Sequence, residues 1–162
     1  MNRRADPETG RGGRTRAREV VFRALFEADA TGDDPVEVLE LSLGRFRFTA
    51  DGRSFALRLV RGAGERRDEI DGHLRELLER WSLERVSAVT RSILRLAVSE
   101  MLVIRETPVL VIVNEAIRLV GRYGEEGADD FVNGVLDAAA RRIRAGSLDA
   151  PSAGREGADT SR

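Results

Sequence analysis

Three arginines at alternate positions are the residues best suited to binding chemistry in this chain of 162 amino acids. Arg14, Arg16 and Arg18 lead into an amphipathic segment whose apolar side includes Val21 and Phe22. Arginine carries a planar, permanent charge that binds phosphate through two parallel hydrogen bonds and stacks on bases. Three positive charges at a helix N-terminus oppose the helix dipole, by about 0.3–1 kcal/mol for each well-placed group. The cluster is therefore either a solvated first turn or a site that orders on RNA.

Composition excludes several kinds of catalytic and metal site. The sequence has no cysteine and one histidine, His73, which excludes disulfides, a cysteine nucleophile and a multi-histidine zinc site. Carboxylates interleave with arginines between Glu65 and Asp71, as they do on solvent-facing helices. No nucleophile–base pair is recognisable. We therefore expect a binding protein that is not an enzyme and holds no metal or cofactor.

Charge and hydropathy indicate where the protein acts. The 27 basic residues, all arginine, nearly balance 28 acidic ones, so the net charge is -1 and a nucleic-acid site must be a local patch. No apolar run approaches the ~20 residues that a membrane span needs. The arginine-rich N-terminus lacks the apolar segment of a secretory signal. We expect a cytoplasmic protein.

The spacing of apolar residues predicts an all-α protein. Apolar positions recur with helical period after residue 14, from 36 to 43, from 51 to 81, and in three blocks between 89 and 144. These segments predict a compact bundle of about six or seven helices over residues 14–145. Residues 1–13 are expected to be a disordered basic arm and residues 146–162 a disordered tail. Residues 45–50 (RFRFTA) are either a brief strand or an extended linker.

Several residues predict where the later helices begin and end. Thr107 is expected to cap a helix whose first residue is Pro108, and this helix includes the β-branched run 109–113. Gly124 is expected to end it in a left-handed conformation. Acidic residues 129–130 suit the N-terminus of the last helix, which is expected to end at Gly146.

Polar and small residues inside helices predict special packing. Gly62 and Gly64 indicate a close crossing of two helices, because glycine otherwise costs about 1 kcal/mol in a helix interior. Asn114 and Asn133 are also poor helix-interior residues. We expect both to be buried asparagines that bond to backbone groups, with Gly134 allowing close packing.

Three of these segments together resemble the NusB family of transcription antitermination factors. The segments are ILRLAVSEM, VIVNEAIRLVGRYG and FVNGVLD, preceded by RTRAREVVFRALFEAD and by a helix break at 81–85. The similarity extends over residues 14–144. It implies an all-helical bundle in two subdomains, without catalytic activity. It also implies binding to the boxA element of ribosomal RNA transcripts together with the ribosomal protein NusE, within the RNA polymerase antitermination complex.

The resemblance also implies roles for individual residues. Arg14, Arg16 and Arg18 would contact RNA phosphates or bases, and Phe131 would stack on a base, an interaction worth about 1–3 kcal/mol. NusE would bind helix faces between residues 84 and 115. The chain departs from the family in its acidic loop, residues 125–130, whose four carboxylates repel phosphate.

Two other functions remain open at the sequence level. One is a helical protein-interaction module, or a homodimer that buries the arginine arm and has no direct role with RNA. The other is the N-terminal domain found in some ribosomal RNA cytosine methyltransferases. The absence of cysteine argues against this second function, because that chemistry needs a cysteine nucleophile.

Overall fold

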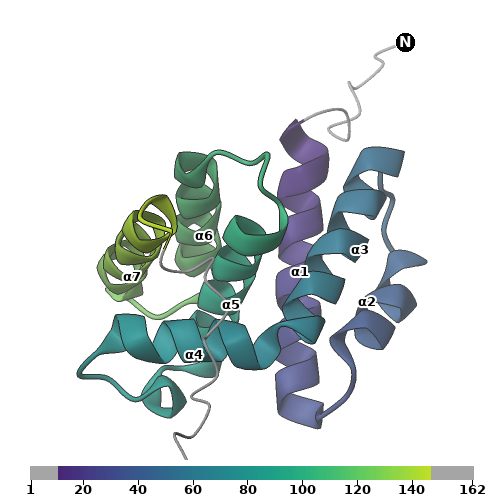
Figure 1. Ribbon diagram of the computed structural model, residues 1–162. Helices are drawn as coiled ribbons and strands as arrows, with labels where there is room; N and C mark the ends of the chain where they lie inside the picture. The colour runs from purple at the N-terminus through teal and green to yellow at the C-terminus, as the bar shows by residue number, and fades with distance from the viewer. Residues whose placement is uncertain (1–10, 147–162) are drawn as a thin grey trace, which may run out of the picture.

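The structure is a computed structural model that describes residues 11–146, and over this range it contains seven α-helices, one 3-10 helix and no strand (Figure 1). The all-α prediction and the predicted number of helices are confirmed. The elements are α1 (Arg11–Thr31), α2 (Pro35–Leu43), α3 (Ala50–Glu65), α4 (Arg67–Leu78), the 3-10 helix (Leu83–Arg85), α5 (Ala88–Val103), α6 (Val109–Tyr123) and α7 (Ala128–Arg144).

The first helix begins earlier than the sequence predicts. Residues 11–13, expected in the disordered arm, form the first turn of α1. The rest of the predicted arm, residues 1–10, and the predicted tail from residue 147 onward lie outside the described residues. The helical N-terminus matters for the arginine cluster, because Arg14 then lies inside a formed helix and its side-chain direction is set.

The helices form two groups that meet along α5. The helices α1, α2 and α3 pack on one another, and α4, α5, α6 and α7 form the second group. Figure 1 shows α1 standing between α3 and the second group, while α4 runs across the other helices. Both α1 and α3 pack on α5, so one continuous core extends through both groups. Its largest fully buried side chains include Phe55, Leu59, Ile93, Leu119 and Leu136.

The long helix expected between residues 51 and 81 is two helices. The chain breaks at Arg66, whose φ and ψ of -105° and 18° end α3 and begin α4. Arg66 is held there by hydrogen bonds of 2.6 and 2.7 Å to Glu69. The physical reason is packing: α3 buries its apolar side against α1, α2 and α5, whereas α4 covers α5 and α7. One straight helix cannot reach both surfaces.

A close crossing at Gly62 joins α3 to α5. A Cβ atom added at Gly62 would lie 2.5 Å from Cγ2 of Val103, which is far inside van der Waals contact. The prediction is confirmed for this glycine. A Cβ added at Gly64 would lie 3.5 Å from Pro35, an ordinary contact. The crossing therefore depends on Gly62 alone.

Two of the predicted helix ends are wrong. Pro108 itself occupies the N-cap position of α6, and the hydroxyl of Thr107 is buried with no hydrogen-bond partner among residues 11–146. Gly124 is extended, with a φ of -86° and a ψ of 176°, while the left-handed conformation falls at Gly127, whose φ is 83°. The chain thus needs extended backbone before it turns into α7. Gly146 has a φ of 73° just after α7, as its predicted helix stop requires.

Of the other local predictions, some are confirmed and one is wrong. Residues 109–113 are helical and the acidic pair at 129–130 lies in the first turn of α7, as predicted. Residues 45–49 are a linker, which decides between the two alternatives for that stretch. Asn114 and Asn133 are both exposed, so the prediction of buried asparagines is wrong. Each lies on the side of its helix that faces away from the core.

An ionic cluster around Asp29 links α1 to α4 and α5. Asp29, near the end of α1, accepts hydrogen bonds from Arg67 at 2.6 Å and Arg91 at 2.9 Å and pairs with Arg95 at 3.1 Å. Arg95 also binds Asp71 through bonds of 2.7 and 2.9 Å. Burial raises the pKa of Asp29, but its hydrogen bond from Arg91 and the other arginines outweigh burial, so this pKa is lowered. The cluster therefore stays ionised and holds the two groups of helices together.

We predict that Gly62→Ala destabilises the protein by about 1–2 kcal/mol, because a clash of about 1–3 kcal/mol exceeds a helix-propensity gain of about 1 kcal/mol. Gly72→Ala in α4 is the matched control: its added Cβ has no neighbour within 4 Å. This control is expected to stabilise by up to ~1 kcal/mol. Urea denaturation measures both.

A second variant tests the cause of the Gly62 effect. Adding Val103→Ala to Gly62→Ala removes the atoms that the new Cβ meets. The double variant is expected to be more stable than the sum of the two single changes. Additive effects would mean that the Val103 contact is not the source of the cost.

Candidate nucleic-acid interface

The arginine cluster divides between two sides of α1. Each residue turns about 100° around a helix, so residues four apart share a side and residues two apart do not. Arg14 and Arg18 point toward α3, where their guanidinium carbons lie 4.7 and 5.0 Å from the ring centroid of Phe55. Arg16 turns the other way, 5.5 Å from the ring centroid of Phe46 in the α2–α3 linker. The three predicted RNA contacts therefore do not form one surface.

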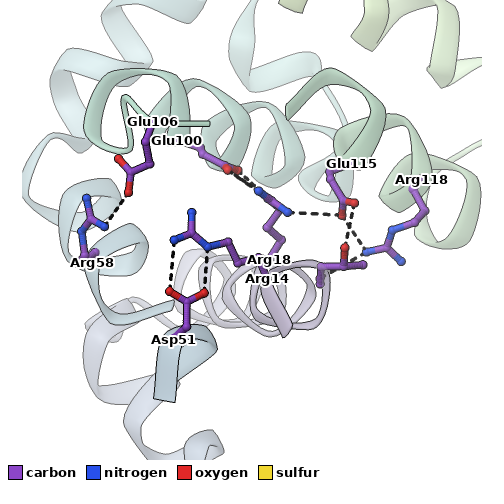
Figure 2. Close-up of polar contacts among 9 residues, drawn as sticks. Arg14, Arg18, Asp51, Arg58, Glu100, Glu106, Glu115 and Arg118 are labelled. Atoms are coloured by element: carbon purple, nitrogen blue, oxygen red, sulfur yellow. Dashed lines mark hydrogen bonds and ion pairs between the residues drawn. The ribbon is translucent and has the colours of Figure 1, made fainter. Parts of the chain in front are cut away.

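Arg18 is buried and paired with a carboxylate. Its Nε and Nη2 donate to Glu100 of α5 at 2.9 and 2.7 Å, and the two side chains are only 5% and 1% exposed (Figure 2). Its Nη1 also lies 3.9 Å from Glu115 of α6. The prediction that Arg18 contacts RNA does not fit this position, because its guanidinium is almost entirely buried and already paired with Glu100. Arg18 instead fastens α1 to α5 and α6.

Arg14 is paired but accessible. Its Nε and Nη2 donate to the two carboxylate oxygens of Asp51 at 3.0 and 3.3 Å, with side-chain exposures of 29% and 66% (Figure 2). The hydrogen bond from Arg14 lowers the pKa of Asp51, and the same bond raises the pKa of Arg14. The carboxylate occupies the paired donors that a phosphate would take. Exchange is feasible, because a released Asp51 would be hydrated.

The remaining charges in Figure 2 balance one another. Glu115 accepts hydrogen bonds from Thr15 at 2.9 Å and from Arg118 at 3.4 Å, and Arg58 of α3 donates to Glu106 at 2.9 Å. Four arginines thus face four carboxylates on this side of α1. A cleft opens here between α1 and the α5–α6 connection. It is lined by Arg14, Thr15, Arg18, Glu106, Thr107, Pro108, Val111 and Glu115.

Phe131 lies in a different groove. It is half-buried in the first turn of α7, in a groove that it shares with Trp81 and Thr90. Trp81, which the sequence pattern marked only as part of a helix break, is 65% exposed and provides a second aromatic surface. Glu125 and Glu126 also line this groove, so the acidic loop lies beside Phe131 as its position in the chain suggested. The structure does not bring Phe131 together with Arg14.

The carboxylate partners of the arginines were missed at the sequence level. Glu100 carried the clearest signal, because it interrupts the apolar run of α5 between Ala97 and Leu102 and is 1% exposed. A buried carboxylate requires a buried cation. Asp51 carried no such signal, since an exposed acidic residue in the first turn of a helix is common.

Among residues 11–146, no group of three or more histidine or acidic side chains is arranged to hold a metal ion. None of the described helices is long and apolar enough to cross a membrane.

Comparisons with known proteins identify one family. The family model described as "NusB family" matches residues 15–141. Transcription antitermination protein NusB of Heliobacterium modesticaldum is 38% identical over 131 residues, which are 81% of this chain and 64% of that protein. The NusB protein of Roseiflexus sp. is 37% identical over 133 residues, 81% of this chain and 94% of that protein.

Solved NusB structures have the same fold as this chain and share 29–38% of its residues over the matched region. The structure of T. maritima NusB superposes with a TM-score of 0.76 at 38% identity and covers 83% of this chain and 92% of that one. A structure described as antitermination factors NusB and NusE in complex with dsRNA has a TM-score of 0.73 at 29% identity, with coverages of 82% and 98%.

We predict that Glu100→Leu destabilises the protein by about 3–5 kcal/mol, because it leaves the charge of Arg18 buried and unpaired. Replacing both partners, as Arg18→Met with Glu100→Leu, is expected to recover most of that loss, since no charge then remains buried. Urea denaturation of the two single variants and the double variant gives the coupling. A double variant as unstable as Glu100→Leu alone would contradict the ion-pair explanation.

Proposed function

Because the chain belongs to the NusB family, we propose that it is a transcription antitermination factor that binds boxA RNA of ribosomal RNA transcripts together with NusE. In this role it assists read-through by RNA polymerase and acts in the cytoplasm by binding, without catalysis. One observation carries the proposal: the fold matches a NusB chain crystallised with NusE and dsRNA across 82% of this chain. The curated relatives are likewise described as transcription antitermination proteins.

The positions of the arginines support different roles for each. Arg14 binds an RNA phosphate by exchanging it for Asp51, since both anions fit the same pair of donors. Arg16, which is exposed on the other side of α1, makes a separate contact. Arg18 keeps α1 in place through Glu100 and acts as a positioning residue.

The aromatic contact and the protein partner use other surfaces. Phe131 stacks on a base in the groove that it shares with Trp81. NusE binds the helix faces between residues 84 and 115. Within this range, exposed apolar side chains occur at Leu110 and Val111, in the first turn of α6, with exposures of 70% and 40%. Such side chains suit a protein partner better than RNA phosphates.

A titration of labelled boxA RNA, with and without NusE, tests the proposal. We expect NusE to tighten binding, and Arg14→Glu with Arg16→Glu to weaken it. Loss of two phosphate contacts lowers the slope of log affinity against log salt by about 1.4, at about 0.7 per contact to a single strand. Arg141→Glu with Arg144→Glu on α7 is the control, since it changes net charge equally at exposed positions.

Two outcomes would contradict parts of this proposal. An unchanged salt slope in the Arg14 and Arg16 variant would show that the arginine cluster is not the RNA site. Absence of specific boxA binding, with or without NusE, would favour the interaction module or homodimer. Analytical ultracentrifugation with and without RNA distinguishes these two.

The exchange at Arg14 leads to a further prediction. Asp51→Asn frees the guanidinium of Arg14 and is expected to raise boxA affinity by up to about fivefold, since an exposed ion pair is worth about 0.2–1 kcal/mol. Asp137→Asn is the matched control, because Asp137 forms an exposed ion pair with Arg141 on α7. Equal affinities for the two variants would exclude the exchange.

A further inference from the structure

A second groove lies on the side of α1 that Arg16 faces. It runs between α1, the α2–α3 linker and the C-terminal part of α6, and we call it the α1–α6 groove. Its lining residues are Arg16, Glu19, Val20, Arg23, Phe46 and Arg122.

The α1–α6 groove carries an excess of positive charge. Its single carboxylate, Glu19, is 15% exposed and lies 3.6 Å from Arg23, 3.7 Å from Arg118 and 3.0 Å from Arg122. Glu19 also accepts a hydrogen bond from the hydroxyl of Tyr123. Because Arg118 also pairs with Glu115, two guanidinium groups of the groove, those of Arg23 and Arg122, face the single carboxylate of Glu19, which leaves a local charge of about +1. The cluster in Figure 2, by contrast, is balanced.

Two arginines of the α2–α3 linker flank Phe46, the linker residue that lines this groove. Arg45 and Arg47 are exposed, and neither has a carboxylate partner among residues 11–146. Between them in the chain lies Phe46, half-buried, whose ring is 6.4 Å from that of Phe48. Both phenylalanines pack against the core, whereas Arg45 and Arg47 lie in solvent beside them. The linker therefore presents basic and aromatic side chains in alternation.

The arginines of the groove are held in place by an aromatic support. The guanidinium carbons of Arg23 and Arg122 lie 5.6 and 5.4 Å from the ring centroid of Tyr123. Tyr123 in turn packs on Phe22, at a ring separation of 5.1 Å. Side chains that are ordered before binding lose less entropy when a ligand arrives. Arg23 and Arg122 are thus held in position before any ligand binds.

We propose that the α1–α6 groove binds the sugar–phosphate backbone of single-stranded RNA that flanks the segment held at Arg14 and Phe131. Basic grooves with partly exposed aromatic rings bind single strands independently of sequence. Arg23, Arg45, Arg47 and Arg122 contact phosphates, and the ring of Phe46 supports a sugar or base. This inference rests on the proposed RNA-binding function and adds a second contact zone to it.

The test compares a minimal boxA RNA with the same RNA extended at both ends by unstructured nucleotides. The groove variant carries Arg45→Ser, Arg47→Ser and Arg122→Ser. The control carries Arg75→Ser, Arg141→Ser and Arg144→Ser, three exposed arginines of α4 and α7. Circular dichroism and thermal unfolding establish that all proteins are folded. Fluorescence anisotropy across a salt series gives affinities and salt slopes.

The wild-type protein is expected to bind the extended RNA roughly tenfold more tightly than the minimal RNA. The groove variant should bind the minimal RNA as the wild type does and lose the gain from extension. Its salt slope on extended RNA should fall by about 2, at about 0.7 for each of three lost phosphate contacts. No gain in the wild type, or an equal gain in the groove variant, would overturn the proposal.

A scrambled RNA of the extended length separates this inference from the proposed function. If the wild type does not distinguish boxA from scrambled RNA, the boxA function fails. The groove is then tested on the scrambled RNA alone. Weaker binding by the groove variant than by the control variant supports the groove, and equal binding overturns it.

Discussion

The buried ion pair between Arg18 and Glu100 is the interaction on which the candidate nucleic-acid interface depends. Each group would be costly in the core without the other, so α1 cannot rotate or slide along α5 without exposing a charge to apolar surroundings. Because α1 is held in this way, the directions of the neighbouring side chains are determined. Arg14, one turn earlier, lies against α3, and Arg16 faces the opposite side. The ion pair between Arg18 and Glu100 thereby determines which sides of α1 the other two arginines face.

This distribution explains how a protein with a net charge of -1 can offer RNA a positive surface. On the inner side of α1 the arginines are matched by carboxylates from α3, α5 and α6. On the outer side, Arg23, Arg122 and the exposed linker arginines outnumber Glu19, the one carboxylate that lines the α1–α6 groove among residues 11–146. The acidic residues Glu125 and Glu126 lie near Phe131, in a separate groove. Positive and negative side chains are therefore concentrated on different surfaces, although the chain contains nearly equal numbers of each.

Helical periodicity and the family motifs were sufficient to predict the all-α fold, because apolar spacing within each helix is a local property. The break at Arg66 was not predictable, since α3 and α4 separate only to reach different neighbours. Helix geometry predicts that the arginine cluster divides between two sides of α1. It does not predict the carboxylates that bind the arginines, because Asp51 lies 37 residues from Arg14 and Glu100 lies 82 residues from Arg18. The alternation of arginine and phenylalanine at residues 45–48 is evident in the sequence. Only the folded structure shows that Arg122 and Phe46 line the same groove. Long-range pairing carries no local pattern in one sequence.

Tyr123 has a consequence for how an RNA would be read. Its hydroxyl bonds to Glu19 in the middle of α1, while its ring packs on Phe22, so the end of α6 is fastened to α1. Phe131 follows this fixed point after a short loop and the first turn of α7. The proposed base-stacking position is therefore joined through Tyr123 to the helix that carries the proposed phosphate-binding arginines. An RNA held at both positions would have to span a fixed distance between them. Inserting or deleting a nucleotide in that span would move either the base or the phosphate out of contact.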